Sequence, residues 1–179
     1  MRGAQLIIGN VISLFAAVIM CFSAVAHTRR RLYLLQLVEC AVLMLAQLVF
    51  GYPSAALVLA LGGVRNIFIL YERYTLRAMC IFIGMIFISF SLTFGGGAVE
   101  LLPLAATLLF TVGAYFARGV VGTKIVFSGV LALWSVYSFI IRDFPTGVTN
   151  AVSAILSVAT VVAHIRHGEK RETKKSLNA

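Results

Sequence analysis

Two side chains of opposite charge lie inside apolar segments of this sequence. Glu39 falls within the run Leu32–Phe50, and Arg65 falls within the run Ser54–Tyr71. A carboxylate and a guanidinium can form a charge-assisted pair with each other, or each can bind a polar solute. An ion inside hydrocarbon costs at least roughly 2.5–3.5 kcal/mol and is normally paired or faces a cavity. Both outcomes require a polar interior in an otherwise apolar protein.

The two charges are predicted to lie at the same depth. Gly51-Tyr52-Pro53 joins the two runs as a hairpin, and a helix rises about 1.5 Å per residue. Glu39 therefore lies about 11–12 Å from Arg31 along its helix. By the same measure, Arg65 lies about 10–11 Å from Glu72. Because the hairpin reverses the chain, we predict a Glu39–Arg65 ion pair, which either forms a solute or coupling site or only fixes the helix register.

Amide, hydroxyl and aromatic side chains extend this polar interior. At 3.6 residues per turn, one helix face carries Gln36, Glu39, Leu43 and Gln47. Such a face must contact protein or water, because lipid offers no hydrogen bonds. The predicted solute-binding residues are Glu39, Arg65, Asn66, Trp134, Tyr137 and Asn150, with Gln36 and Ser157 as secondary candidates.

Each of these candidates also has a purely structural interpretation. Trp134 and Tyr137, one turn apart near mid-membrane, could stack on a planar or sugar-like solute or could form an aromatic core. The hydroxyl of Ser157 can bond a carbonyl one turn back in its own helix and then needs no ligand. Asn10 and Gln47 lie at similar depths, and we expect them to bond each other.

The composition is that of a membrane protein. Hydrophobic residues make up 61% of the 179 residues and charged residues 12%, against about 45–50% and 25% in soluble domains. The net charge is +9, and most of the charged residues lie between the apolar segments and at the C-terminus. That placement favours membrane topology and anionic lipid headgroups as partners over nucleic acid.

Catalytic and cofactor motifs are not found in the sequence. No two acids are spaced for acid–base chemistry, and no Walker or dinucleotide glycine motif occurs. Cys21, Cys40 and Cys80 lie in apolar segments without metal-ligand spacing, so we expect inert buried thiols and neither a disulfide nor a metal site. We therefore expect neither a cofactor nor enzymatic activity.

Seven segments are long and apolar enough to cross a bilayer as helices. The fifth is the weakest of them, because it contains Pro103 and Gly113, and six helices are the alternative. The first could also be a signal peptide cut near Ala24-Val25-Ala26, but it is longer than such a segment and precedes Arg29-Arg30-Arg31. The predicted segments are Gln5–Ala26, Leu32–Phe50, Ser54–Tyr71, Arg77–Phe94, Leu101–Ala117, Lys124–Ile141 and Thr146–Arg166.

Basic residues alternate between the two sides of the membrane. The first, third and fifth connections and the tail hold Arg29, Arg30, Arg31, Arg73, Arg77, Arg118, Lys124, Arg166, Lys170, Arg171, Lys174 and Lys175. The other side has Gly51–Pro53 without charge, Gly95–Glu100 with one acid, and the balanced pair Arg142-Asp143, besides Arg2. By the positive-inside rule, the N-terminus lies outside and the C-terminus in the cytoplasm.

A short repeat divides the chain into two halves. Tyr52-Pro53-Ser54 and Phe144-Pro145-Thr146 share an aromatic–Pro–hydroxyl pattern. The bundle, residues 1–166, then consists of a triplet (5–71), a linker helix (77–94) and a second triplet (101–166), as in parallel-repeat transporters of the SWEET type. Residues 167–179 form a basic cytoplasmic tail, expected to be too short to fold, which contacts anionic headgroups or only solubilises the protein.

The run Val99-Glu100-Leu101-Leu102-Pro103 resembles the YgjV-like family of small bacterial inner-membrane proteins. The basic first loop, the Tyr52-Pro53 turn, Arg65, the segment from Trp134 to Tyr137 and Arg166 match as well. The resemblance covers the chain up to about Arg166 and implies a multi-pass protein of the bacterial inner membrane. The family often has an amide at the position of Ser138 and an acid at that of Asn150, so a site using those groups is not carried over.

The predicted architecture is similar to the three-plus-one-plus-three plan of SWEET and PnuC-type transporters. By that analogy, the leading hypothesis is a transporter or facilitator that binds a small polar solute between the triplets and rocks one against the other. Glu39 would then fix charge or carry a coupling proton. The alternative is a structural or accessory membrane protein whose polar residues only hold the bundle together. A homo-oligomer is compatible with either.

Overall fold

The chain folds as a bundle of membrane-spanning helices. A computed structural model describes residues 3–24, 26, 28–117 and 119–177, and these contain seven α-helices, one short 3-10 helix and no strand. Each α-helix contains a stretch long and apolar enough to cross a membrane. The elements are α1 (Gly3–Ala24), α2 (Arg29–Phe50), α3 (Pro53–Leu70), α4 (Leu76–Thr93), η1 (Ala98–Glu100), α5 (Leu101–Phe116), α6 (Gly119–Ile140) and α7 (Phe144–Leu177).

This architecture confirms the predicted all-α, seven-helix fold, and the six-helix alternative is wrong. Arg2, Val25 of the candidate cleavage motif, and Arg118 lie outside the described residues. The prediction placed Lys124 at the edge of a loop, whereas it lies buried inside α6. The uncharged residues 119–123 allow that helix to begin one turn earlier, and a long lysine stem can extend along apolar surface.

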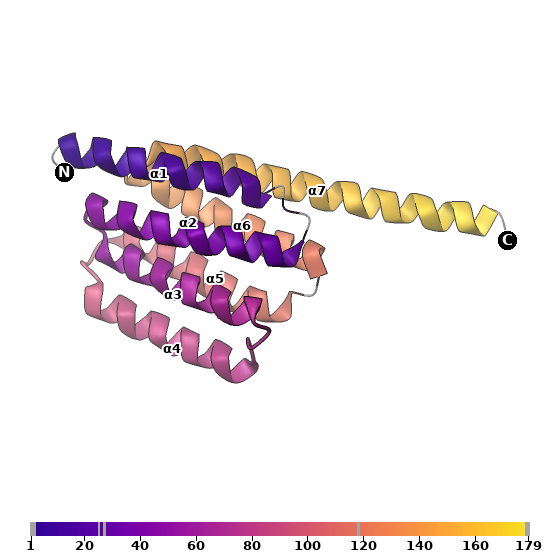
Figure 1. The fold of residues 1–179 in the computed structure, drawn as a ribbon, viewed down its shortest axis with the longest axis horizontal. Coiled ribbons are helices and arrows are strands. Elements are labelled where there is room, and N and C mark those ends of the chain that lie inside the picture. The colour runs from indigo at the N-terminus through magenta and orange to yellow at the C-terminus, as the bar shows by residue number, and fades with distance from the viewer. Residues whose placement is uncertain (1–2, 25, 27, 118, 178–179) are drawn as a thin grey trace.

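Successive helices run in opposite directions, so the connections gather at two ends of the bundle (Figure 1). The end with residues 50–53, 94–100 and 141–143 is here called the turn end, and it also holds the start of α1. The end with residues 71–75 and 117–119 is called the basic end. The turn end is the predicted periplasmic side, and the basic end is the predicted cytoplasmic side.

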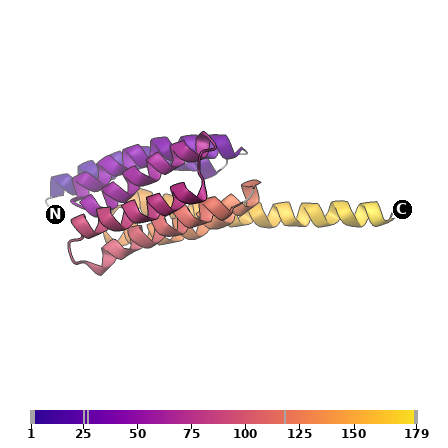
Figure 2. The same cartoon turned by 90° about the horizontal axis from the view of Figure 1, so that it is seen from below.

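The last helix continues well past the bundle. Figures 1 and 2 show α7 leaving the basic end as a single straight helix that extends away from the other six. It ends at Leu177, so residues 167–177 continue the seventh helix, whereas we expected a tail too short to fold.

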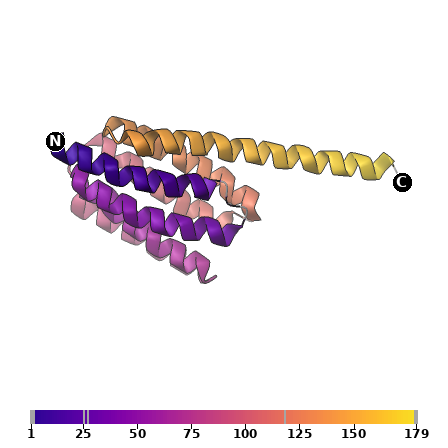
Figure 3. The same cartoon turned by 45° about the horizontal axis from the view of Figure 1, so that its top comes forward.

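The helices form two facing layers. Within one layer α2 lies between α1 and α3, and within the other α6 lies between α7 and α5. Across the layers α1 packs along α7 (Figure 3), α3 packs on α5, and α2 faces α6. Helix α4 packs outside this ring, against α3 and α5. A two-fold axis between α2 and α6 would produce this order, although the repeat itself stays a prediction.

Three helices end in the left-handed backbone region. Gly51 (φ 82°) follows α2, Glu72 (φ 56°) follows α3, and Arg142 (φ 65°) follows α6. In each case the next residue donates its N–H back to a carbonyl in the last turn of the helix, at 2.8–2.9 Å. That bond satisfies one of the helix-terminal carbonyls, which have no partner within the helix. Glycine adopts this conformation without strain, whereas Glu72 and Arg142 do so at a cost of about 1–2 kcal/mol.

Polar side chains of the spans are buried in the bundle together with an apolar core, and many other large apolar side chains face outward. Ser13, Gln47, Asn66 and Thr111 are each at most 1% exposed, while Leu92 is 81% exposed. This inverted pattern is expected where lipid surrounds the protein, because the bundle interior is the only place that offers hydrogen-bond partners within the membrane.

The cysteines differ from the expected buried thiols. Cys21 and Cys80 are exposed on the outer surface of the bundle, and Cys40 is half-buried. Their apolar sequence neighbours predicted burial, but in a membrane protein such neighbours are equally common on the lipid-facing side.

Candidate functional site

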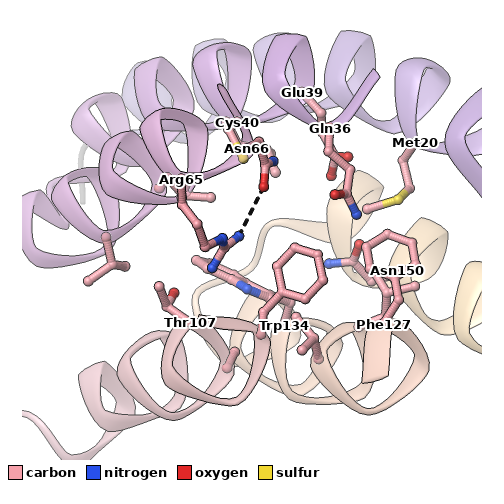
Figure 4. Close-up of a pocket in the computed structure, with 18 residues that line it drawn as sticks. Met20, Gln36, Glu39, Cys40, Arg65, Asn66, Thr107, Phe127, Trp134 and Asn150 are labelled. Atoms are coloured by element: carbon pink, nitrogen blue, oxygen red, sulfur yellow. Dashed lines mark hydrogen bonds between the residues drawn. The ribbon is translucent and has the colours of Figure 1, made fainter. Parts of the chain in front are cut away.

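A cavity of about 60 Å³ lies between the two helix layers. One water needs about 10–15 Å³ measured in this way, so the cavity has room for a few water molecules or a small solute. Helices from both layers supply its walls (Figure 4). Six of the eight residues predicted from sequence line it, namely Gln36, Glu39, Arg65, Asn66, Trp134 and Asn150.

Arg65 reaches across the bundle from α3 to α5. Its Nη1 donates a hydrogen bond of 2.9 Å to the Thr111 hydroxyl, and its Nη2 donates one of 3.3 Å to Asn66 Oδ1. The guanidinium carbon also lies 4.3 Å from the centre of the Phe110 ring. All of these partners are uncharged, so a charge buried to 3% exposure is solvated by dipoles and by an aromatic face.

The predicted Glu39–Arg65 ion pair is wrong for this structure. Among the residues that the structure describes, no ion pair joins the two side chains, although both line the same cavity. Helix rise fixes how deep a residue lies but not where its side chain points around the helix axis. The two charges therefore share a cavity without touching.

Glu39 lies in the cavity wall beside apolar side chains such as Met20 and Leu43. It is 6% exposed, and the structure records no hydrogen bond or ion pair for its carboxylate within the described part of the chain. Gln36, one turn earlier on α2, and Asn150 of α7 point into the same part of the cavity (Figure 4).

Three further polar atoms of the cavity-lining side chains have no hydrogen-bond partner within the described part of the chain. They are Gln36 Oε1, Arg65 Nε and Asn66 Nδ2, and each is buried. An unpaired buried donor or acceptor costs about 1–3 kcal/mol. Such atoms near a cavity indicate a place where a solute or water completes the bonding.

Trp134 and Tyr137 have different roles. Trp134 faces the cavity, whereas Tyr137 is fully buried behind it and does not appear among the described lining residues. The Tyr137 hydroxyl donates to Gln47 Oε1 at 2.9 Å, and its ring meets the Trp134 ring edge to face, with centroids 5.6 Å apart. This geometry matches the aromatic-core alternative for Tyr137 and leaves Trp134 as the aromatic wall of the cavity.

Two other expectations from the sequence are also revised. Asn10 does not bond Gln47: its amide donates to the carbonyls of Leu6 and Arg142 and accepts from the N–H of Phe144. Ser157 is buried but lies outside the described lining of the cavity. In both cases depth predicted the neighbourhood but not the direction of the side chain.

The sequence reasoning missed the contribution of α5. Thr107 lines the cavity, and Thr111 accepts the bond from Arg65 and also donates to the Thr107 carbonyl at 2.7 Å. These two threonines are one turn apart in a segment that is otherwise apolar. That spacing places both hydroxyls on one helix face and could have identified α5 as part of the site.

A larger hollow opens at the basic end. It measures about 660 Å³ and is lined by Arg30, Tyr33, Glu72, Tyr74 and Tyr115, among others. A layer of contacting side chains separates it from the cavity. In this layer Tyr33 of the hollow stacks on Phe110 of the cavity, with ring centroids 6.2 Å apart.

Tyr74 belongs to the same layer. Its hydroxyl donates to the backbone carbonyl of Thr111 at 2.8 Å, just beside the bond from Arg65 to the Thr111 hydroxyl. Burial raises the pKa of Tyr74 to about 12, so this phenol stays protonated and remains a donor at neutral pH. We call Tyr33, Phe110, Arg65, Thr111 and Tyr74 the basic-end layer.

The turn end is sealed by hydrogen bonds between the two helix layers. Ser54 at the start of α3 donates to Glu100 at 2.5 Å, and Ser13 of α1 donates to Asp143 at 3.0 Å. Burial raises the pKa of Asp143, and the bonds from Thr146 and Ser13 partly oppose that shift. The first bond ties the start of α3 to η1, and the second ties the middle of α1 to the turn before α7.

The geometry agrees with what the comparisons with known proteins found. The model of the Imp-YgjV family, described as a bacterial inner membrane protein, matches residues 7–168. The chain belongs to this family. A search of curated proteins and a search of solved structures each found no match. As a member of the YgjV family, the chain is a multi-pass protein of the bacterial inner membrane.

Proposed function

We propose that this YgjV-family protein carries a small polar solute across the inner membrane, through the cavity between its two helix layers. The observation that supports the proposal best is the set of unpaired polar groups on the cavity wall. The carboxylate of Glu39 and the atoms Asn66 Nδ2 and Arg65 Nε have no hydrogen-bond partner among the described residues. They would be costly in a protein whose polar residues only hold helices together, because such groups stabilise a bundle only when they are paired.

The two ends of the bundle support the same proposal. The hollow at the basic end brings water close to the cavity, and the basic-end layer separates the two. The turn end is held shut by bonds between the triplets. This is the arrangement expected of a carrier that faces the basic end, in which rocking of the triplets would break the turn-end bonds and close the hollow.

The cavity can be filled without changing any charge. Gly62 lines it, and a Cβ at this position would lie 3.6 Å from Arg65 Nη2 and 3.9 Å from Cys40 Sγ, which are ordinary contacts. The remaining atoms of a leucine would occupy the cavity. Gly84 of α4 is exposed and has no atom within 4 Å of an added Cβ. Gly84→Leu is therefore the matched control.

Transport is measured on purified protein in liposomes, by light scattering as they swell with entering solute. We expect the wild-type protein and Gly84→Leu to admit at least one solute of a panel of sugars, polyols, amino acids and organic acids. Gly62→Leu should reduce that rate at least tenfold. A folded wild-type protein that admits nothing, with both variants only changing thermal stability, would instead support the structural alternative.

A further inference from the structure

The charges of the cavity define the chemistry of its ligand. Among the described residues that line it, one acid, Glu39, and one base, Arg65, carry formal charge. They come from neighbouring helices, α2 and α3, and do not form an ion pair. Each charge therefore lacks a counter-ion, while the cavity as a whole is neutral.

From this separation we propose that the solute is a small zwitterion, with a protonated amine and a carboxylate in the same molecule. This rests on the proposed function, since it names the class of solute that the cavity carries. The amine would lie at Glu39 and the carboxylate at Arg65. A zwitterion leaves the site neutral and supplies both missing counter-ions, whereas a simple anion or cation leaves one buried charge unpaired and adds net charge.

The unpaired atoms are distributed in the same way. Asn66 Nδ2 and Arg65 Nε are donors from adjacent residues of α3, suited to the two oxygens of a carboxylate. Gln36 Oε1 is an acceptor one turn from Glu39 on α2, suited to an ammonium N–H. All three atoms are buried, so the ligand reaches them when the amide and guanidinium planes rotate.

The remaining walls suit such a ligand. Trp134 and Phe127 supply apolar and aromatic surface to the cavity, and Phe127 lies beside Asn150 (Figure 4). An aromatic face attracts an ammonium group electrostatically, most strongly when both are desolvated. The cavity, at about 60 Å³, limits the ligand to a small solute. A dianionic phosphate fits less well, because the described lining offers one cation opposite one acid.

The test uses sets of ligands that match in size and differ only in charge. Glycine is a zwitterion, glycolate an anion, glycinamide a cation and glycolamide neutral; the corresponding sets based on β-alanine and 4-aminobutyrate extend the spacing between the groups. Binding to the purified full-length protein is measured by the rise in its melting temperature and by calorimetry. We expect the zwitterion of at least one length to bind roughly 10- to 100-fold more tightly than its anionic and cationic counterparts.

Variants assign each charge of the ligand to one residue. Glu39→Gln should abolish the preference for glycine over glycolate, and Arg65→Met the preference for glycine over glycinamide. Arg65→Lys, which retains the charge, should keep the second preference. For the wild-type protein, tighter binding of the anion or the cation at every length, or equal binding of all four compounds, would overturn the proposal. For the variants, unchanged preferences in protein that is folded would also overturn it.

This result is separable from transport. Zwitterion binding without uptake in liposomes would contradict the proposed function and leave the ligand class standing. Uptake confined to solutes of another charge class would support the proposed transport function and contradict the zwitterion as its ligand.

Discussion

The turn end and the basic end of the bundle are built from the same helices and hold together differently. At the turn end, side chains of one helix layer bond directly to side chains of the other, as Ser13 does to Asp143 and Tyr137 to Gln47. At the basic end, Arg65 also bonds a side chain of the other layer, the Thr111 hydroxyl, and Tyr74 bonds the main-chain carbonyl of Thr111. Beyond these bonds lies a hollow of about 660 Å³. The layers are thus bonded to each other at both ends, and at the basic end a large hollow lies beyond the bonds.

This difference shows where the bundle can move. When the layers part, breaking a bond between two buried side chains leaves both polar groups without a partner. Breaking a bond from a side chain to a helix carbonyl is less costly, because the carbonyl keeps its N–H partner within the helix. Opening the turn end therefore requires a compensating gain elsewhere. In the proposed carrier, closure of the hollow and binding of a ligand between Glu39 and Arg65 would be the two sources of such a gain.

The largest expected effect comes from removing one hydroxyl at each end. Tyr137→Phe leaves Gln47 Oε1 buried without its donor, because Gln47 is 1% exposed. We expect a loss of about 1–3 kcal/mol in stability. Tyr74→Phe removes a bond to the Thr111 carbonyl, which keeps its helical position, and should cost about 0.5–1.5 kcal/mol. Thermal unfolding of both variants in the same detergent checks the ranking.

The same pair of variants also distinguishes the contribution of the hydrogen bonds from that of ring packing. Both substitutions remove only an oxygen, and both rings pack against other aromatic rings. Equal losses of stability would mean that the two ends are fastened alike, and the comparison would fail.

A smaller effect is expected from pH at the turn end. Burial raises the pKa of Asp143, so the folded protein holds this proton to a higher pH than the unfolded chain does. Between the ordinary and the raised pKa, stability therefore falls as pH rises. We expect the melting temperature of the wild-type protein to fall from pH 4 to pH 7 by more than that of Asp143→Asn, whose amide does not titrate.

The basic end provides the control for this pH dependence. Burial raises the pKa of Tyr74 in the basic-end layer to about 12, so this phenol does not change its charge in that window. Tyr74→Phe should therefore follow the wild-type pH curve. If Asp143→Asn follows it too, Asp143 does not shift its pKa on folding and the turn end gains nothing from its proton.

The sequence was sufficient for the parts of the structure that one-dimensional patterns determine. Hydropathy predicted the seven helices, and helix rise predicted the depth of Glu39 and Arg65, both of which line the cavity. A side chain at a known depth in a compact bundle has few places to point other than the centre or the lipid, which is why six of the eight predicted residues line the cavity.

Contacts that depend on rotation about the helix axis were beyond the sequence. Arg65 bonds Thr111 where Glu39 was expected, and Asn10 bonds the start of α7 where Gln47 was expected. Several acceptors lie at each depth, and the choice among them follows from how the helices pack. Tyr137, predicted as a solute-binding residue, lies outside the described cavity lining for the same reason. Its ring is turned behind Trp134, and its hydroxyl bonds Gln47 of α2.

The central claim is a polar cavity that lies closer to water at the basic end than at the turn end, and Cys40 tests it most directly. This native thiol lines the cavity, and Cys21→Ala with Cys80→Ala makes it the single cysteine of the chain. The rate of Cys40 modification by a membrane-impermeant thiol reagent is measured in membrane vesicles of each orientation. The reagent should react at least tenfold faster from the basic-end face than from the turn-end face. A bound ligand should slow the reaction. Equal rates from both faces, or no reaction from either, would contradict the account.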